Sequence, residues 1–218
     1  MTTIETDATC TVGVLEYQKF AEQFEPLIKQ ARTKRHQDAI IGLRAFLMGL
    51  GEGDRRDEAM VQLDRVDVAV QGNRWQSNAV GLILEASCVE QSEEVPDFMP
   101  LLDTCSSFFY EWNEEHAETI FTFFGFLSDH TLRWASQVDT WRAIVAPEML
   151  PPVAEAMEGL SAREVRKMLI AAENGDVFSE DEAREFGRWW DAFRKAIRVA
   201  TRLGEGLYVC VKVSEPNS

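Results

Sequence analysis

The stretch from Glu180 to Leu203 is the sequence feature that most constrains the fold of this chain. At about 100° per residue, its bulky apolar side chains fall on one side of a helix and its bases fall within about 40° of a line on the other. The apolar face consists of Phe186, Trp190, Phe193, Ile197 and Ala200, and the basic stripe consists of Arg184, Arg188, Lys195, Arg198 and Arg202. Such a helix either packs on the core with its bases in solvent or lies on a membrane or in a partner's groove. We favour the packed arrangement.

Helical periodicity also dominates the rest of the chain. Apolar side chains recur at helical spacing over residues 15–28 and 39–50, and Gly51 and Gly53 end the second pattern. Residues 57–71 fit both a helix and an alternating strand, and we prefer the helix. Further helices are predicted over residues 77–89, 96–112, 114–127 and 131–146.

Capping signals support several of these helices independently. Ser161 with Glu164, and Ser179 with Glu182, have the spacing of the capping box, in which two side chains satisfy free amides at a helix start. Asn113 is suited to cap the helix that follows it.

The fold class predicted from these patterns is all-α. A chain of 218 residues with 45% hydrophobic content suffices for a single globular multi-helix domain over residues 1–218. Residues 207–213 are strand-prone, however, and one strand cannot stand alone. Its expected mate is residues 10–14, so we allow a small β pairing of the N- and C-terminal segments.

Charge is strongly segregated along the chain. The formal net charge is −15, and between Arg74 and Arg133 there are eleven carboxylates and no Lys or Arg. These acids cannot all be buried or paired within their own segment, so we expect them to form a surface. The candidate partner-binding residues are Glu85, Glu90, Glu93, Glu94, Asp97, Glu111, Glu114, Glu115 and Glu118. An acidic protein repels phosphate backbones at long range, which predicts a basic protein as partner and no direct contact with nucleic acid.

Composition and motifs exclude several other classes. Four scattered cysteines without a Cys-x-x-Cys pair indicate reduced thiols, and no signal peptide or transmembrane segment is evident, so we expect a cytoplasmic protein. Nucleophile-elbow, P-loop, dinucleotide and zinc-protease motifs are all missing from the sequence. No catalytic residue and no cofactor are therefore predicted.

Two segments resemble metal sites, but each lacks residues that the ligand pattern requires. The carboxylates around His116 lack the Glu-x-x-His pairs of a di-iron bundle, because Asn113 stands three residues before the histidine. Residues 172–182 resemble a calcium loop, but Ala172 replaces the first aspartate and Val177 replaces the glycine. We predict no metal site.

The sequence favours a non-enzymatic interaction protein whose acidic surface binds and inhibits a basic partner. A nuclease or another nucleic-acid-binding protein would suit, as for an immunity protein or a mimic of nucleic-acid charge. Two alternatives stay open. The phenylalanine-rich residues 108–126 could enclose a lipid or another apolar ligand in a helical carrier, and the carboxylates of residues 111–118 could serve a metal-dependent enzyme.

Overall fold

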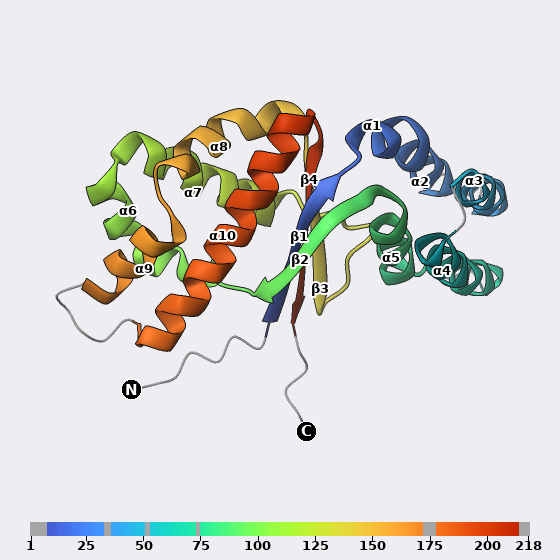
Figure 1. The fold of residues 1–218 in the computed structure, drawn as a ribbon. Helices are drawn as coiled ribbons and strands as arrows, with labels where there is room; N and C mark the ends of the chain where they lie inside the picture. Colours follow the sequence, from blue (N-terminus) through green and yellow to red (C-terminus); the bar gives the residue numbers. More distant parts are fainter. Residues whose placement is uncertain (1–7, 33–35, 51–52, 73–74, 172–177, 214–218) are drawn as a thin grey trace, which may run out of the picture.

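A four-stranded antiparallel sheet lies between two layers of helices (Figure 1). The structure is a computed structural model that describes residues 8–32, 36–50, 53–72, 75–171 and 178–213. The strands are β1 (Ala8–Leu15), β2 (Val89–Pro96), β3 (Thr140–Val145) and β4 (Gly206–Val213), in the order β2-β1-β4-β3. The first and last strands of the chain are therefore the two central strands of the sheet.

The first part of the chain supplies the helices that cover one face of the sheet, on the right in Figure 1. Tyr208 and Cys210 of β4 point into the apolar cluster that these helices enclose. The helices are α1 (Tyr17–Lys19), the π-helical turn η1 (Phe20–Phe24), α2 (Glu25–Arg32), α3 (His36–Met48), α4 (Asp54–Gln71) and α5 (Ser77–Cys88).

The later part of the chain covers the opposite face, on the left in Figure 1. Leu207, Val209 and Val211 of β4 point into this second and larger cluster. Its helices are the 3₁₀ turns η2 (Met99–Leu101), η3 (Asp103–Cys105) and η4 (Pro147–Met149), together with α6 (Ser106–Trp112), α7 (Glu114–Asp129), α8 (Leu150–Glu158), α9 (Ala162–Ala171) and α10 (Glu180–Leu203). Because both faces of β4 are covered, the strand is an almost continuous apolar run.

The all-α prediction is wrong, because the sheet has two strands that the sequence patterns did not show. The expected pairing of the terminal segments is present as the antiparallel pair of β1 and β4. The predicted helix over residues 131–146 is replaced by a turn region and β3, which pairs with β4. Its apparent helical stripe included Val138, which is fully exposed. Strand β3 has only six residues, and both of its faces are covered. In so short a segment, apolar residues four positions apart fit one face of a strand as well as one face of a helix.

Strand β2 gave no signal because its middle five residues are polar and exposed. It forms the outer edge of the sheet and contains a bulge, at which Gln91 adopts a left-handed conformation (φ 48°). Gly13 of β1 lies opposite, where a Cβ atom would come within 3.2 Å of the Glu90 carbonyl oxygen. A side chain at position 13 would therefore crowd the bulged strand.

Several local predictions are confirmed. Residues 57–71 belong to helix α4, and helices α5 and α7 lie close to their predicted positions. Ser179 and Glu182 form the capping box of α10, and the Asn113 side chain accepts a hydrogen bond from the His116 amide at 3.0 Å. The prediction for residues 96–112 is wrong in part, because only α6 is a regular helix there.

Candidate functional site

Four of the predicted carboxylates gather where α6 ends and α7 begins. Glu111 lies in the last turn of α6, and Glu114, Glu115 and Glu118 lie in the first two turns of α7; all four are exposed. Within the described part of the chain, none of them forms an ion pair. Like charges one turn apart, such as Glu114 and Glu118, repel each other and cost a few tenths of a kcal/mol.

The C-terminal end of α8 adds two further carboxylates to this region. Gly159, just beyond α8, lies so close to Trp112 of α6 that a Cβ atom would be 3.2 Å from the indole ring. Glu155 and Glu158 of α8, which lie within about one turn of Gly159 along the chain, are exposed and also lack ion pairs among the described residues. We call these six residues the acidic end: Glu111, Glu114, Glu115, Glu118, Glu155 and Glu158.

Glu90, Glu93 and Glu94 lie apart from the acidic end, on the edge strand β2. All three are exposed, and Glu93 approaches Lys195 of α10 at 3.7 Å. Charged side chains on an edge strand prevent a second sheet from pairing with it. These residues therefore have a structural role whether or not they also bind a partner.

Glu85 belongs to a buried polar network between the sheet and α5. Its side chain is only 23% exposed. Its Oε1 atom accepts hydrogen bonds from Arg142 Nε at 2.9 Å and from the Tyr208 hydroxyl at 2.5 Å. The Arg142 side chain is fully buried, so Glu85 is the counter-ion of a cation that water does not reach.

Each of the two terminal nitrogens of Arg142 also has an acceptor. One terminal nitrogen donates to the Ala135 carbonyl at 2.6 Å, and the other donates to Asn78 Oδ1 at 3.1 Å. Gly81 of α5 makes room for the guanidinium, because a Cβ atom there would lie 2.5 Å from Arg142 Cζ. The network thus joins α5, β3, β4 and the loop before β3.

The pKa shifts in this network keep it in one protonation state. Burial, followed by the neighbouring Glu85 carboxylate, raises the pKa of Tyr208 well above its usual value. Burial disfavours the charged form of Arg142, but Tyr208, Cys210 and Glu85 outweigh this, and the pKa of Arg142 is raised. The phenol therefore keeps its proton and the guanidinium keeps its charge at neutral pH, as suits a structural network.

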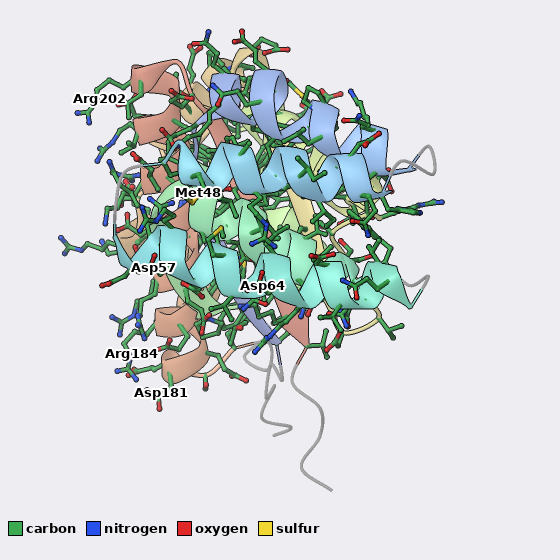
Figure 2. All side chains as sticks on the ribbon, turned by 90° about the vertical axis from the view of Figure 1, so that its right-hand side faces the viewer. Met48, Asp57, Asp64, Asp181, Arg184 and Arg202 are labelled. Atoms are coloured by element: carbon green, nitrogen blue, oxygen red, sulfur yellow. The ribbon has the colours of Figure 1, made fainter. Side chains whose placement is uncertain are left out.

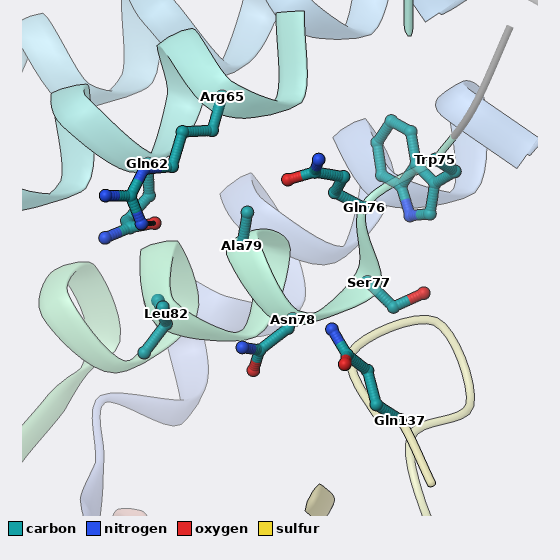
Figure 3. Close-up of a pocket in the computed structure, with 9 residues that line it drawn as sticks. All are labelled: Gln62, Arg65, Trp75, Gln76, Ser77, Asn78, Ala79, Leu82 and Gln137. Carbon is teal, nitrogen blue, oxygen red and sulfur yellow. Dashed lines mark hydrogen bonds between the residues drawn. The ribbon is translucent and has the colours of Figure 1, made fainter. Parts of the chain in front are cut away.

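An open cavity of about 410 Å³ lies beside this network (Figure 3). Its lining includes Gln62 and Arg65 of α4, Trp75 before α5, Asn78 of α5 and Gln137 before β3. The Trp75 Nε1 atom is buried without a hydrogen-bond partner among the described residues. Among the described residues of the lining, Arg65 is the one that carries a charge, so these residues offer mainly neutral hydrogen-bonding groups. No pattern in the sequence marks this cavity, because its lining comes from separate segments of the chain.

Asp97 is also buried, with 4% of its surface exposed, and therefore does not contribute to an acidic surface. Its Oδ1 atom accepts a hydrogen bond from the Met99 amide at 3.1 Å. Burial raises the pKa of its carboxyl, and that one hydrogen bond opposes the shift without cancelling it.

Helix α10 lies against the sheet with its apolar face fully covered. Trp190 donates a hydrogen bond from Nε1 to the Leu160 carbonyl at 2.8 Å, and Phe193 contacts Phe124 with ring centroids 5.2 Å apart. The five bases of the basic stripe stay exposed, and Figure 2 shows Arg184 and Arg202 projecting from opposite ends of the helix. The structure thus has the packed arrangement, and a binding role for the basic stripe stays a prediction.

The phenylalanines considered for a ligand carrier are part of the packed core. Phe109, Phe123 and Phe124 are buried, and none of them lines the cavity of Figure 3. Within the ranges that the structure describes, no group of three His, Cys, Asp or Glu side chains could hold a metal ion. The calcium-like loop falls largely on residues 172–177, outside the described residues.

Comparisons with known proteins give no family for this chain. No protein-family model, no curated protein and no solved structure matches it. Among the helices of the described residues, none has the length and apolar character needed to cross a membrane.

Proposed function

We propose that this protein is a non-enzymatic inhibitor that binds a basic partner protein through the acidic end. The observation that supports the proposal is the group of six exposed carboxylates, none of which has an ion-pair partner among the described residues. Repulsion between like charges one turn apart, such as Glu114 and Glu118, is relieved when a basic surface covers them. Association with a basic partner would thus give these carboxylates the ion pairs that they lack among the described residues.

The partner class follows from the same charges. A cleft that holds a row of phosphates presents lysines and arginines at its surface, as in a nuclease or another nucleic-acid-binding protein. An array of carboxylates can occupy such a cleft and exclude the nucleic acid. Free, buried cysteines favour a reducing compartment, so the proposal places the complex in the cytoplasm.

The test compares two variants that lose the same charge at different places. In one, Glu111, Glu114, Glu115 and Glu118 are replaced by Gln. The matched control is D54N/D57N/E58Q/D64N on α4, on the other side of the sheet, where all four side chains are exposed and Asp54 and Asp57 lie in a first helical turn as Glu114 and Glu115 do (Figures 1 and 2). Each variant removes four negative charges from the formal charge of −15.

Binding of poly-L-lysine is measured by calorimetry at low ionic strength, because 0.1 M salt screens interactions between exposed charges that are more than about 10 Å apart. We expect the acidic-end variant to bind at least about tenfold more weakly, equivalent to about 1.4 kcal/mol, and the α4 variant to lose less than about threefold. Equal losses would mean that net charge alone attracts the probe, and would contradict the proposal. The same variants are then measured against partners purified from the source cells.

A further inference from the structure

A second charged feature, with the opposite sign, lies between helices α9 and α10. The two helices approach closely at Gly187, where a Cβ atom would be 3.3 Å from the Ala162 carbonyl oxygen. Beside this contact is a groove of about 310 Å³, at the small end of the range for small-molecule sites. Four arginines line it: Arg163 and Arg166 from α9, and Arg184 and Arg188 from α10.

The two α9 arginines have no ion-pair partner among the described residues. On α10, Arg184 pairs with Asp181, and Arg188 pairs with Glu185 at 2.8 Å, both one turn away along the same helix. Exposed pairs of this kind contribute little to stability, so a bound anion can replace them. Arg188 in addition uses a single terminal nitrogen for its bonds to Glu185, which leaves its other donors available.

The chemistry of this lining selects the class of ligand. A guanidinium presents five N–H donors in a planar fork that matches the oxygens of a phosphate. Four such groups around one small groove can satisfy several phosphate oxygens at once. Physiological salt screens the effect on the groove of exposed charges that are more than about 8 Å away.

The groove is closed to a long polyanion at one end. Its lining also includes Asp191, one turn beyond Arg188, and Glu93 of β2. Lys195 follows Asp191 by one turn and approaches Glu93 at 3.7 Å, so this end of the groove lies beside β2. A phosphate chain that followed the basic stripe would have to pass both carboxylates.

We propose that the groove between α9 and α10 binds a small phosphate-bearing ligand, held by Arg163, Arg166, Arg184 and Arg188. This site is separate from the acidic end and does not depend on the function proposed above. It divides the basic stripe of α10 into two parts: Arg184 and Arg188 face the α9 arginines, whereas Arg198 and Arg202 are exposed outside the groove.

Three double variants test the proposal by calorimetric titration of the full chain with inorganic pyrophosphate at low ionic strength. R163Q/R166Q and R184Q/R188Q each remove two groove arginines, from different helices. The matched control R198Q/R202Q removes two exposed arginines from the same helix as the second pair. We expect saturable binding by the wild type, at least about tenfold weaker binding by each groove variant, and a change of less than about twofold in the control. Thermal melting shows whether each variant is folded, and either groove variant suffices if the other unfolds.

Two further probes separate the proposed ligand class from other anions. Citrate carries a comparable charge on carboxylates, and a single-stranded DNA oligonucleotide carries phosphates on a long chain. We expect both to bind more weakly than pyrophosphate. The proposal is overturned if pyrophosphate does not bind saturably, if the control loses as much affinity as the groove variants, or if citrate or DNA binds as tightly.

Discussion

The two faces of the sheet are built from the same strands but are held together in different ways. Along β3 and β4, side chains alternate, so Ala143 and Val209 point toward α6–α10. Their neighbours Arg142 and Tyr208 lie on the side of α1–α5. One period-two pattern thus supplies apolar side chains to one face and adds an ion-pair network to the apolar cluster of the other.

This difference determines which substitutions destabilise each face. On the α6–α10 face, stability comes from apolar area removed from water, and the cost of a truncation scales with the atoms removed. On the α1–α5 face, the network around Arg142 contributes little net energy compared with an apolar replacement, yet removing one member leaves a buried charge without a partner. The α6–α10 face is therefore sensitive mainly to lost volume, whereas the α1–α5 face, which also has an apolar cluster, is in addition sensitive to unsatisfied hydrogen bonds.

The largest expected effect comes from truncating a large buried side chain on the α6–α10 face. Trp190→Ala should lower the free energy of unfolding by about 3–5 kcal/mol, because the side chain is fully buried and its Nε1–H bond to the Leu160 carbonyl is also lost. Urea unfolding followed by far-ultraviolet circular dichroism measures the change. Trp75→Ala, on the other side of the sheet and only partly buried at the open cavity, is the control and should cost clearly less. A loss below about 1 kcal/mol for Trp190→Ala would mean that α10 is not packed as the structure shows.

A somewhat smaller effect should follow from breaking the network on the other face. Glu85→Ala should cost about 3 kcal/mol, at the low end of the range for a broken buried pair, because Glu85 is partly exposed and water can then approach Arg142. Arg142→Met combined with Glu85→Ala should cost less than the sum of the two single changes, since no unpaired cation remains. Additive losses in this double-mutant cycle would show that the two side chains act independently.

The sequence predicted the helical layers better than the layer between them. Helices such as α7 and α10 have an apolar stripe and their own capping residues, both of which are local signals. The strands lack such signals for different reasons: β2 is polar and exposed at an edge, whereas β3 is too short to separate from a helical pattern. Only β4 is apolar enough to be recognised alone, and its mate followed from it.

The candidate sites show the same limit. Exposure of four members of the acidic end, Glu111, Glu114, Glu115 and Glu118, could be expected from charge, since residues 111–118 contain no Lys or Arg. The partners of Glu85 could not, because Arg142 is 57 residues away in the chain and Tyr208 is 123 residues away. The groove arginines on α9 were likewise missed, since their meeting with α10 depends on the packing of two helices at Gly187. Contacts between distant segments carry no spacing pattern.

The smallest effect, and one of opposite sign, is expected at Asp97, a buried carboxyl beside the α6–α10 face without a cationic partner among the described residues. Because burial raises its pKa, the folded protein keeps this proton at pH values where the unfolded chain has lost it. Stability therefore falls as the pH rises from about 3.9 through the folded pKa, and the carboxyl is a cost at neutral pH.

Asp97→Asn removes this cost and keeps an Oδ1 acceptor for the Met99 amide. The variant should be at least as stable as the wild type at pH 7, and its advantage should vanish below about pH 3.9, where the carboxyl is protonated in both states. Glu85→Gln, by contrast, should lose stability at pH 7 because Arg142 loses its counter-ion. Urea midpoints at pH 3.5, 5 and 7 distinguish the two cases. If Asp97→Asn became less stable than the wild type as the pH rose, the ionised Asp97 would be stabilising. The contrast between the two carboxyls would then be wrong.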